Sequence, residues 1–256
     1  AEMPYQFELE ALKAQGVAAY SFALANAGAQ EENPDPALKG ADFAADPEHM
    51  QGYATRESSR EFLGSHYDAA WEKIDQAAEE ISGLVLTWEE EPIFAAYHAI
   101  SCGMTEDASH IWGGGLPYLT PVNSSWDRLA DGYLEEADFS PRQVEEILTE
   151  AYPQLQLEGA EEDWFTQAQY CASGYLESIR AGEVEIPGTQ LRELFGLRSS
   201  AAEVRYESGT FRFLTKGYGH GAGLSQCGAD YMASQGAGCQ EILAHYYPGA
   251  ALVREE

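Results

Sequence analysis

The chain has 256 residues, 45% of them hydrophobic and 12% aromatic, which is enough apolar side chain to build one large or two small globular domains. Its 43 acidic and 14 basic residues give a formal net charge of −29, which repels phosphate backbones and excludes nucleic acid as a partner. No run approaches the roughly 18 apolar residues of a membrane span, and no charged-then-apolar signal peptide opens the chain.

The first predicted element is an alanine-rich helix over residues 8–27. One stripe of small and apolar side chains would let it pack closely against another element at the centre of the fold. That stripe consists of Leu9, Leu12, Gly16, Ala19 and Ala23. Residues 28–52 are rich in Gly, Pro, Asp and Asn and predict a long loop. Asp68 is the predicted N-cap of a helix that runs through Ile81 and is closed by Gly83.

The middle of the chain mixes strands and helices. The stretches "LVLTW" and "IFAAYHA" flank the acidic turn "EEEP" and predict a hairpin. Ser140, Pro141 and Gln143 form a capping-box start for a helix that ends near Ala151. Further helices are predicted over residues 164–180 and 189–195, the second of them stopped by a glycine.

The last part predicts a second hairpin, in which "EVRYE" and "FRFLTKG" are separated by Ser-Gly. This hairpin leads into the glycine-rich segment "GYGHGAGLSQC" at residues 217–227, and "CQEILAHYYPG" is the closing helix, ended by Pro248. With no internal repeat and no clear linker, the pattern favours one α+β domain over residues 1–256, with a central alanine-rich helix, β-hairpins and a cleft.

The N-terminal carboxylates are the first candidates for chemistry. Glu8 and Glu10 open the first helix, where an acidic residue is favourable against the helix dipole without any catalytic role. Glu2 is different, because it precedes the helix beside a proline that stiffens the chain and could hold its carboxyl toward a cleft.

The segment after the first predicted hairpin holds several potential metal ligands. His98 and Cys102 could bind a metal, but the spacing lacks the second pair of ligands typical of zinc sites, and a cleft wall built from a turn is favoured. The cysteines are widely spaced without a Cys-x-x-Cys pair, so the sequence indicates neither a disulfide framework nor a zinc ribbon.

The glycine-rich segment matches no phosphate-binding motif, because it lacks both a GK[ST] ending and the GxGxxG pattern. Ser225 lacks the second glycine of a GxSxG nucleophile. Cys227 and His220 could form a thiol nucleophile and its base, although a buried, inert cysteine is the commoner outcome.

Four blocks of the sequence are more informative about function in combination than singly. They are "EMPYQFELEALKAQGVAAYSFAL", "PIFAAYHAISCGMTEDASHIWGGGLPYLTPVNSSWD", "GTQLRELFGLRSS" and "GYGHGAGLSQCGADYMASQGAGCQEILAHYYPG". In their residues and their order, the chain resembles the stage II sporulation protein D family, also called the amidase-enhancer family, over nearly its whole length. The blocks "EALKAQ" and "GHGxGxSQxGA" are the most specific.

The resemblance implies a lytic transglycosylase of bacterial peptidoglycan, active on glycan strands already stripped of stem peptides, in wall remodelling during sporulation (engulfment). It implies that Glu2 is the catalytic acid and base and that His98, His220, Ser225 and Gln226 bind substrate, with the glycines of the loop admitting the sugar chain. A histidine flanked by glycines has few neighbours, so we expect its loss to affect activity more than folding. The alternative is a non-catalytic glycan-binding module that activates a cell-wall amidase, and a third is a metal-dependent hydrolase.

The partners implied are peptidoglycan strands, a cell-wall amidase and membrane proteins of the engulfment machinery. The location implied is extracytoplasmic, in the cell wall or between the mother-cell and forespore membranes, with a membrane anchor in the full-length precursor. Relatives often have arginine at the position of Tyr20 and tyrosine at that of Cys227. Some bind zinc through a Cys…His-Cys cluster, of which this chain keeps His49 but has Ala44 and Met50, so no metal and no cofactor is expected. The family domain usually has a strand ahead of "EMP", so we expect this sequence to begin inside the domain, without that strand.

Overall fold

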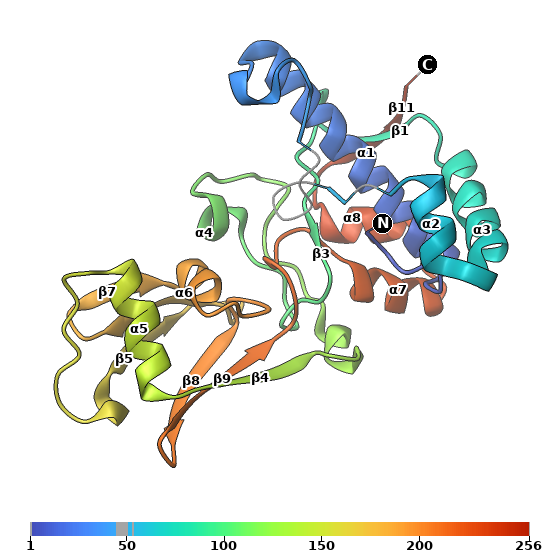
Figure 1. Ribbon diagram of the computed structural model, residues 1–256. Helices are drawn as coiled ribbons and strands as arrows, with labels where there is room; N and C mark the ends of the chain where they lie inside the picture. Colours follow the sequence, from blue (N-terminus) through green and yellow to red (C-terminus); the bar gives the residue numbers. More distant parts are fainter. Residues whose placement is uncertain (1, 45–50, 53, 256) are drawn as a thin grey trace. The chain divides into compact units, whose positions relative to one another are not determined.

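A computed structural model describes residues 2–44, 51–52 and 54–255. Within them helices and small sheets alternate, which confirms the predicted α+β class (Figure 1). The chain forms two compact units. Unit 1 lies within residues 1–97, 117–119 and 228–256, and unit 2 within 98–116 and 120–227. The prediction that one family domain spans residues 1–256 stays a prediction.

Unit 1 is mainly helical. Its helices and helical turns are α1 (Leu9–Glu32), η1 (Pro36–Leu38), α2 (Arg56–Leu63), η2 (Gly64–His66), α3 (Tyr67–Glu80), most of α7 (Gln226–Ser234) and α8 (Cys239–Tyr246). A three-stranded antiparallel sheet has the order β11-β1-β2, with bounds Ala251–Arg254, Leu84–Trp88 and Glu91–Pro92. Helix α1 packs against α3, α8 and β1, so the predicted alanine-rich helix is central to this unit.

The buried face of α1 differs from the predicted stripe. The five residues of that stripe are only partly buried, whereas the fully or almost fully buried positions are Ala11, Ala14, Gln15, Val17, Ala18 and Ser21. The reason is that α1 has α3, α8 and β1 around it, which bury more than one face. Gly16 still allows a close approach, because a Cβ there would lie 2.4 Å from Cδ1 of Ile81. Ser21 joins helix to sheet, since its hydroxyl accepts from the Leu86 amide at 2.8 Å.

Several boundaries in unit 1 also differ. Helix α1 continues to Glu32, so the predicted loop starts later, and α3 begins one residue before Asp68, which is therefore in the first turn and not the cap. A hairpin follows β1, but its second strand β2 lies inside the predicted turn, with Glu89 and Glu90 at φ 53° and 71°. The strand predicted over residues 93–99 is wrong, because only Tyr97–His98 form a strand there and it pairs with β10 (Leu224–Ser225). Strand β11, which lies on the other side of β1, was not predicted.

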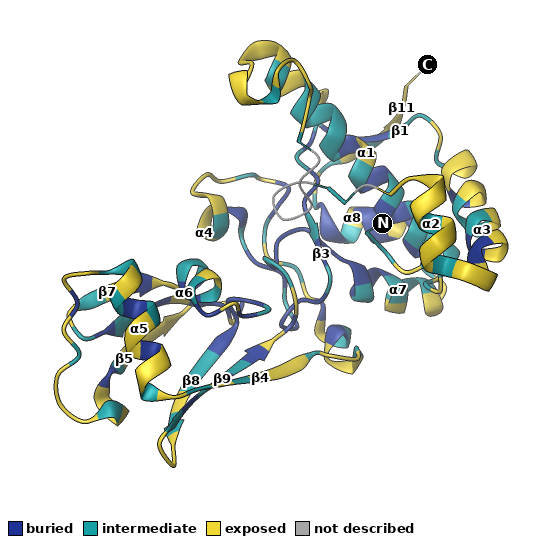
Figure 2. Cartoon of the chain, in the orientation of Figure 1, coloured by how far each residue is buried: buried dark blue, intermediate teal, exposed yellow. Residues whose placement is uncertain are grey.

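Unit 2 contains two three-stranded antiparallel sheets with the orders β4-β9-β8 and β5-β6-β7. The strands are β4 (Leu134–Phe139), β5 (Phe165–Tyr170), β6 (Leu176–Ala181), β7 (Val184–Pro187), β8 (Ala202–Glu207) and β9 (Thr210–Lys216). The helical elements are α4 (Ala108–Trp112), η3 (Ser125–Leu129), α5 (Pro141–Ala151), η4 (Glu161–Asp163) and α6 (Gly188–Leu194). Helix α5 buries Val144 and Leu148 and exposes its other face (Figure 2).

An aromatic cluster forms the core of unit 2. Phe195 and Phe213 stack at 4.6 Å between ring centroids, and Phe139 meets both of them edge to face. Trp164 stacks on Phe211 at 5.6 Å. These rings come from separate segments of the chain and bury large apolar areas, so they hold the sheets and helices of this unit in one cluster.

The helix predicted over residues 164–180 is wrong, because this segment forms the antiparallel strands β5 and β6. Its turn contains Gly174 at φ +98°, a conformation that a helix cannot use. Strand β6 buries Leu176 and Ile179, both of which join the aromatic cluster, so tertiary packing decides the structure here.

Other predictions for unit 2 are confirmed. Ser140 and Gln143 make the reciprocal capping box of α5. Strands β8 and β9 form a hairpin around Ser208 and Gly209, both with positive φ, as a two-residue turn requires. Two short strands remain, β3 (Tyr97–His98) and β10 (Leu224–Ser225), and the unpredicted helix α7 (Gln226–Ser234) follows β10 directly.

Candidate active site

The glycine-rich loop at residues 217–223 is a chain of left-handed glycines. All four of its glycines have positive φ, from 71° at Gly223 to 110° at Gly219. At Gly219 a Cβ would lie 2.7 Å from the Cβ of His98, and at Gly221 it would lie 2.4 Å from the Tyr175 ring. The loop therefore needs these glycines for its own backbone and packing, without reference to a ligand.

Backbone hydrogen bonds anchor the loop at several points within unit 2. Ile100 and Tyr218 exchange both of their bonds, at 3.0 and 2.7 Å. The Glu106 amide donates to the Gly221 carbonyl at 2.8 Å. The guanidinium of Arg198 lies 4.3 Å from the centroid of the Tyr218 ring. The loop is thus preorganised by its surroundings.

His220 has more neighbours than its glycine-flanked sequence predicts. Its Nδ1 accepts a hydrogen bond from the Ala222 amide at 3.1 Å, which places the proton of a neutral ring on Nε2. Its ring meets Trp112 edge to face at 4.9 Å and lies 5.7 Å from the His98 ring. The expectation that His220 contributes little to folding is therefore wrong in its premise, because this side chain both packs and caps the loop.

His98 lies beneath the loop. It is 4% exposed, and its Nδ1 lies 3.0 Å from the Ala222 carbonyl oxygen, so Nδ1 carries the proton of the neutral ring and donates. Burial, with a smaller contribution from His220, lowers the pKa of His98 to about 3. A neutral, buried histidine in this position supports the loop, and the prediction that it touches substrate stays a prediction.

Ser225 and Gln226 are also buried, at 0% and 7% exposure. The Ser225 hydroxyl lies 3.5 Å from the Ala99 carbonyl. It also hydrogen-bonds the carboxyl of Asp127, which accepts from the Ser101 amide at 2.8 Å. Burial raises the pKa of Asp127 despite these bonds. These contacts give Ser225 a structural partner, and its predicted role in binding substrate is not tested by them.

Glu2 belongs to unit 1, where it precedes α1 and is half-buried. Its Oε1 accepts a hydrogen bond from the Gly52 amide. Burial and, secondly, the charge of Glu2 raise the pKa of Tyr97, whose buried hydroxyl has no partner among the described residues. The sequence analysis missed Tyr97, because nothing in its local pattern distinguishes it from a core tyrosine. That Glu2 faces the loop of unit 2 stays a prediction.

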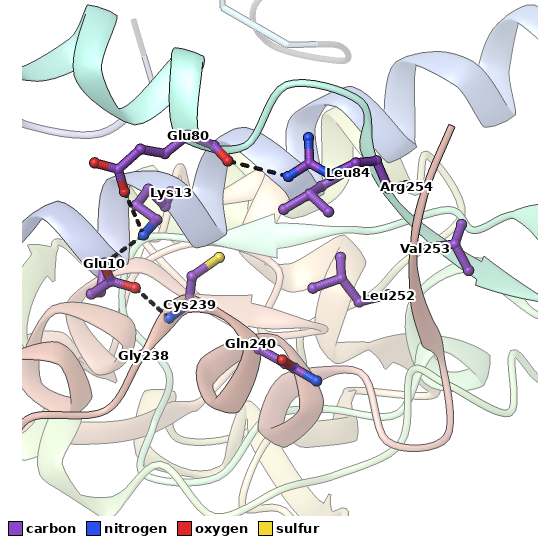
Figure 3. Close-up of a pocket in the computed structure, with 10 residues that line it drawn as sticks. All are labelled: Glu10, Lys13, Glu80, Leu84, Gly238, Cys239, Gln240, Leu252, Val253 and Arg254. Carbon is purple, nitrogen blue, oxygen red and sulfur yellow. Dashed lines mark hydrogen bonds and ion pairs between the residues drawn. The ribbon is translucent and has the colours of Figure 1, made fainter. Parts of the chain in front are cut away.

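Glu10 has a structural role, as its place in the first turn of α1 suggests. Its carboxylate accepts from Lys13 at 2.7 Å and from the Cys239 amide at the start of α8, also at 2.7 Å (Figure 3). Lys13 in turn pairs with Glu80 of α3 at 2.8 Å. Burial would raise the pKa of Glu10, but its bonds to Lys13 and Cys239 outweigh this and lower it.

His98 and Cys102, which the sequence offered as potential metal ligands and for which a cleft wall was favoured, do not come together with a third ligand among the described residues. Cys102 contacts the carbonyl of Ser173 through its sulfur at 3.2 Å. Within the described part of the chain, the group of three potential ligands is instead Glu106, His110 and Cys171. Ala44 is described, whereas His49 and Met50 of the zinc loop lie outside the described residues. The four cysteines, all of them among the described residues, form no disulfide bond.

Over the described ranges, the structure contains no helix with the length and apolar character needed to span a bilayer.

Proteins of two Bacillus species are similar to this chain. Residues 1–88 match a family model described as "Stage II sporulation protein". The chain is 34% identical to stage II sporulation protein D of Bacillus amyloliquefaciens, over 97% of this chain and 70% of the relative. It is 30% identical to the protein of that name from Bacillus subtilis (strain 168), over 98% and 71%. An amidase enhancer of Bacillus subtilis (strain 168) is 23% identical, over 98% of this chain and 39% of the relative.

Proposed function

Because the chain belongs to the stage II sporulation protein D family, we propose that it is a peptidoglycan lytic transglycosylase that remodels the cell wall during sporulation. Its substrate is a glycan strand stripped of stem peptides, and it cleaves the glycosidic bond between N-acetylmuramic acid and N-acetylglucosamine. It acts outside the cytoplasm, in the wall or between the mother-cell and forespore membranes. A large negative charge, formally −29, is compatible with an uncharged sugar chain and unfavourable for nucleic acid.

One carboxyl group is sufficient for this reaction. Protonated Glu2 gives its proton to the glycosidic oxygen as the bond from C1 of the muramic residue breaks. The resulting carboxylate takes the proton of the C6 hydroxyl of the same residue, and O6 forms the new bond to C1. The product is a 1,6-anhydro sugar, water is not consumed, and Glu2 regains its proton. A hydrolase would instead need two carboxyl groups at a set separation.

The observation that supports this role best is the position of Glu2 in the segment that matches the family. The Gly52 amide orients its carboxylate, and Glu2 is near enough to the buried Tyr97 hydroxyl for its charge to raise the pKa of that tyrosine. By contrast, the carboxylate of Glu10 is engaged by Lys13 and by the start of α8. Glu2 is therefore the better candidate of the two for proton transfer.

The glycine-rich loop is the proposed binding element. Since Nδ1 of His220 is engaged by the Ala222 amide, Nε2 is the ring atom that can donate to a sugar oxygen. His98, Ser225 and Gln226 are more buried, and we assign them to the support of the loop and to its polar floor.

The decisive experiment compares Glu2→Gln with Glu8→Gln on peptide-free glycan strands, with products identified by mass spectrometry. The amide keeps the size of the carboxyl but cannot transfer a proton, so Glu2→Gln should lose cleavage and retain binding to insoluble strands. Glu8 has an exposed side chain and is the matched control, which should retain both. Anhydro products from Glu2→Gln at the normal rate would move the role to another residue, with Glu10→Gln tested next.

A second candidate function is the activation of a cell-wall amidase by a non-catalytic glycan-binding module. It is favoured by the name of one relative, the amidase enhancer. In that case both the unmodified protein and Glu2→Gln would stimulate an added amidase equally, and neither would release anhydro products. Membrane proteins of the engulfment machinery are further proposed partners.

A further inference from the structure

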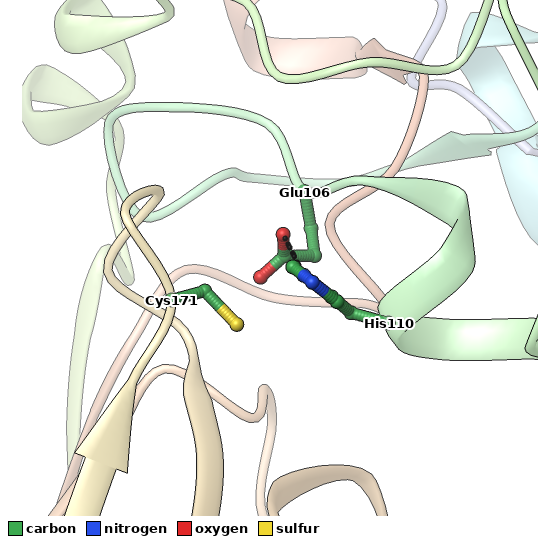
Figure 4. A group of neighbouring side chains, drawn as sticks. All are labelled: Glu106, His110 and Cys171. Carbon is green, nitrogen blue, oxygen red and sulfur yellow. Dashed lines mark hydrogen bonds and ion pairs between the residues drawn. The ribbon is translucent and has the colours of Figure 1, made fainter. Parts of the chain in front are cut away.

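A mixed ligand cluster lies in unit 2, in the turn that leads into α4 and at the end of β5. Glu106 precedes α4, His110 lies within it and Cys171 directly follows β5 (Figure 4). One ligand atom from each residue lies within 4.8 Å of the other two. Nδ1 of His110 and Oε1 of Glu106 lie 3.0 Å apart.

Glu106 is the buried member of the cluster, at 2% exposure. Its Oε1 accepts from the Asp107 amide at 2.7 Å, and its Oε2 accepts from the Ser173 hydroxyl at 2.8 Å. These donors fix the direction of the carboxylate. A buried carboxylate is stabilised by a nearby positive charge, which the His110 ring supplies when it is protonated.

Cys171 is the third member, and its thiol proton is directed at Glu106. The Cys171 side chain hydrogen-bonds the Glu106 carboxylate. A cation between the two side chains would take the place of this proton, because a bound metal removes the proton of a coordinating thiol.

We propose that Glu106, His110 and Cys171 bind a divalent transition-metal ion of the zinc class. A thiolate with an imidazole selects such ions over Mg²⁺ and Ca²⁺, which prefer oxygen ligands alone. Three protein ligands leave a fourth position for water. The side chains adjoin a cavity of about 220 Å³ that is also lined by Ile111 and Thr189, which leaves room for that water.

The geometry needs only a small adjustment. Bond lengths of 2.0–2.3 Å in a tetrahedral zinc site separate its ligand atoms by roughly 3.3–3.7 Å. The pair His110–Glu106 is already near this value, and Cys171 lies within about 1 Å of it, given its limit of 4.8 Å. Ser173 is then the outer partner that orients the Glu106 carboxylate, as second partners commonly do for metal ligands.

The site is linked to the glycine-rich loop in two ways. The Glu106 amide donates to the Gly221 carbonyl, and the Tyr175 ring, which packs on Gly221, follows Cys171 in the same turn. A metal ion would therefore tie the turn before α4 to the end of β5 and fix the support of the loop. This inference does not depend on the proposed function. It departs from the expectation of no metal in this chain, which was based on the residues of the loop at 44–50.

The test is a titration of the tag-free, metal-free protein with Co²⁺, because the absorption spectrum of the bound ion depends on the ligands that hold it. We expect about one equivalent to bind, with visible d–d bands of a four-coordinate ion and a thiolate-to-cobalt charge-transfer band. Zn²⁺ should displace the cobalt and raise the melting temperature. Cys171→Ser should lose the charge-transfer band and bind at least about tenfold more weakly, and His110→Ala should also weaken binding.

Cys239→Ser is the matched control, because Cys239 is equally a free cysteine but lies in unit 1. It should keep both the band and the affinity. Unchanged melting of metal-free Cys171→Ser would exclude misfolding as the cause of its loss. The proposal is overturned if no thiolate band appears with cobalt, or if the band survives in Cys171→Ser.

Discussion

Replacement of His220 tests how the glycine-rich loop holds its shape. In His220→Ala the amide of the fully buried Ala222 loses its acceptor, which costs about 1–3 kcal/mol for an unsatisfied buried group. The lost ring contacts with Trp112 and His98 add about 0.5–1.5 kcal/mol. The free energy of unfolding should therefore fall by about 2–4 kcal/mol, which corresponds to a melting temperature lower by about 5–10 °C for a chain of this size.

His220→Asn separates the hydrogen bond from the ring. Oδ1 of asparagine stands at nearly the same distance from the backbone as Nδ1 of histidine, so it can accept from the Ala222 amide. It should recover about half of the lost stability by calorimetry. Cleavage of glycan strands should stay low in both variants, because neither supplies Nε2. A melting temperature within about 1 °C of the original for His220→Ala, or equal destabilisation by both substitutions, would refute this account of the loop.

Three further outcomes are expected. Tyr97→Phe should lower the cleavage rate about tenfold with little change in melting temperature, because its buried hydroxyl has no partner among the described residues and interacts with Glu2. Gly221→Ala should destabilise unit 2 by about 2–5 kcal/mol in denaturant unfolding, since φ is +93° and the new Cβ would overlap the Tyr175 ring. Stability should fall as pH drops from 6.5 toward about 3, because the unfolded chain protonates His98 and the folded chain does not, and this slope should flatten in His98→Asn when thermal unfolding is followed across pH.

Local signals in the sequence predict the elements whose partners are neighbours in the chain. Ser140 and Gln143 cap each other within one turn, and Ser208-Gly209 closes its own hairpin, so both predictions are confirmed. The helix predicted over 164–180 failed because Leu176 and Ile179 bury themselves against distant aromatic residues, which no local pattern reveals. The candidate residues of the site could be found by resemblance. Their surroundings could not, since Trp112 and Tyr175 reach the loop from other segments.

The division of the chain also bears on the order of folding during synthesis. Unit 2 takes nearly all its residues from one continuous stretch, so its aromatic core can close once residue 227 has left the ribosome. Unit 1 must wait longer, because β1 pairs with β11 and Glu10 holds the start of α8 across 229 residues of sequence. Until then the side of α1 that packs against α8 stays uncovered. Nascent unit 1 is accordingly the part of the molecule that most needs protection by chaperones, although it carries the residue proposed for proton transfer.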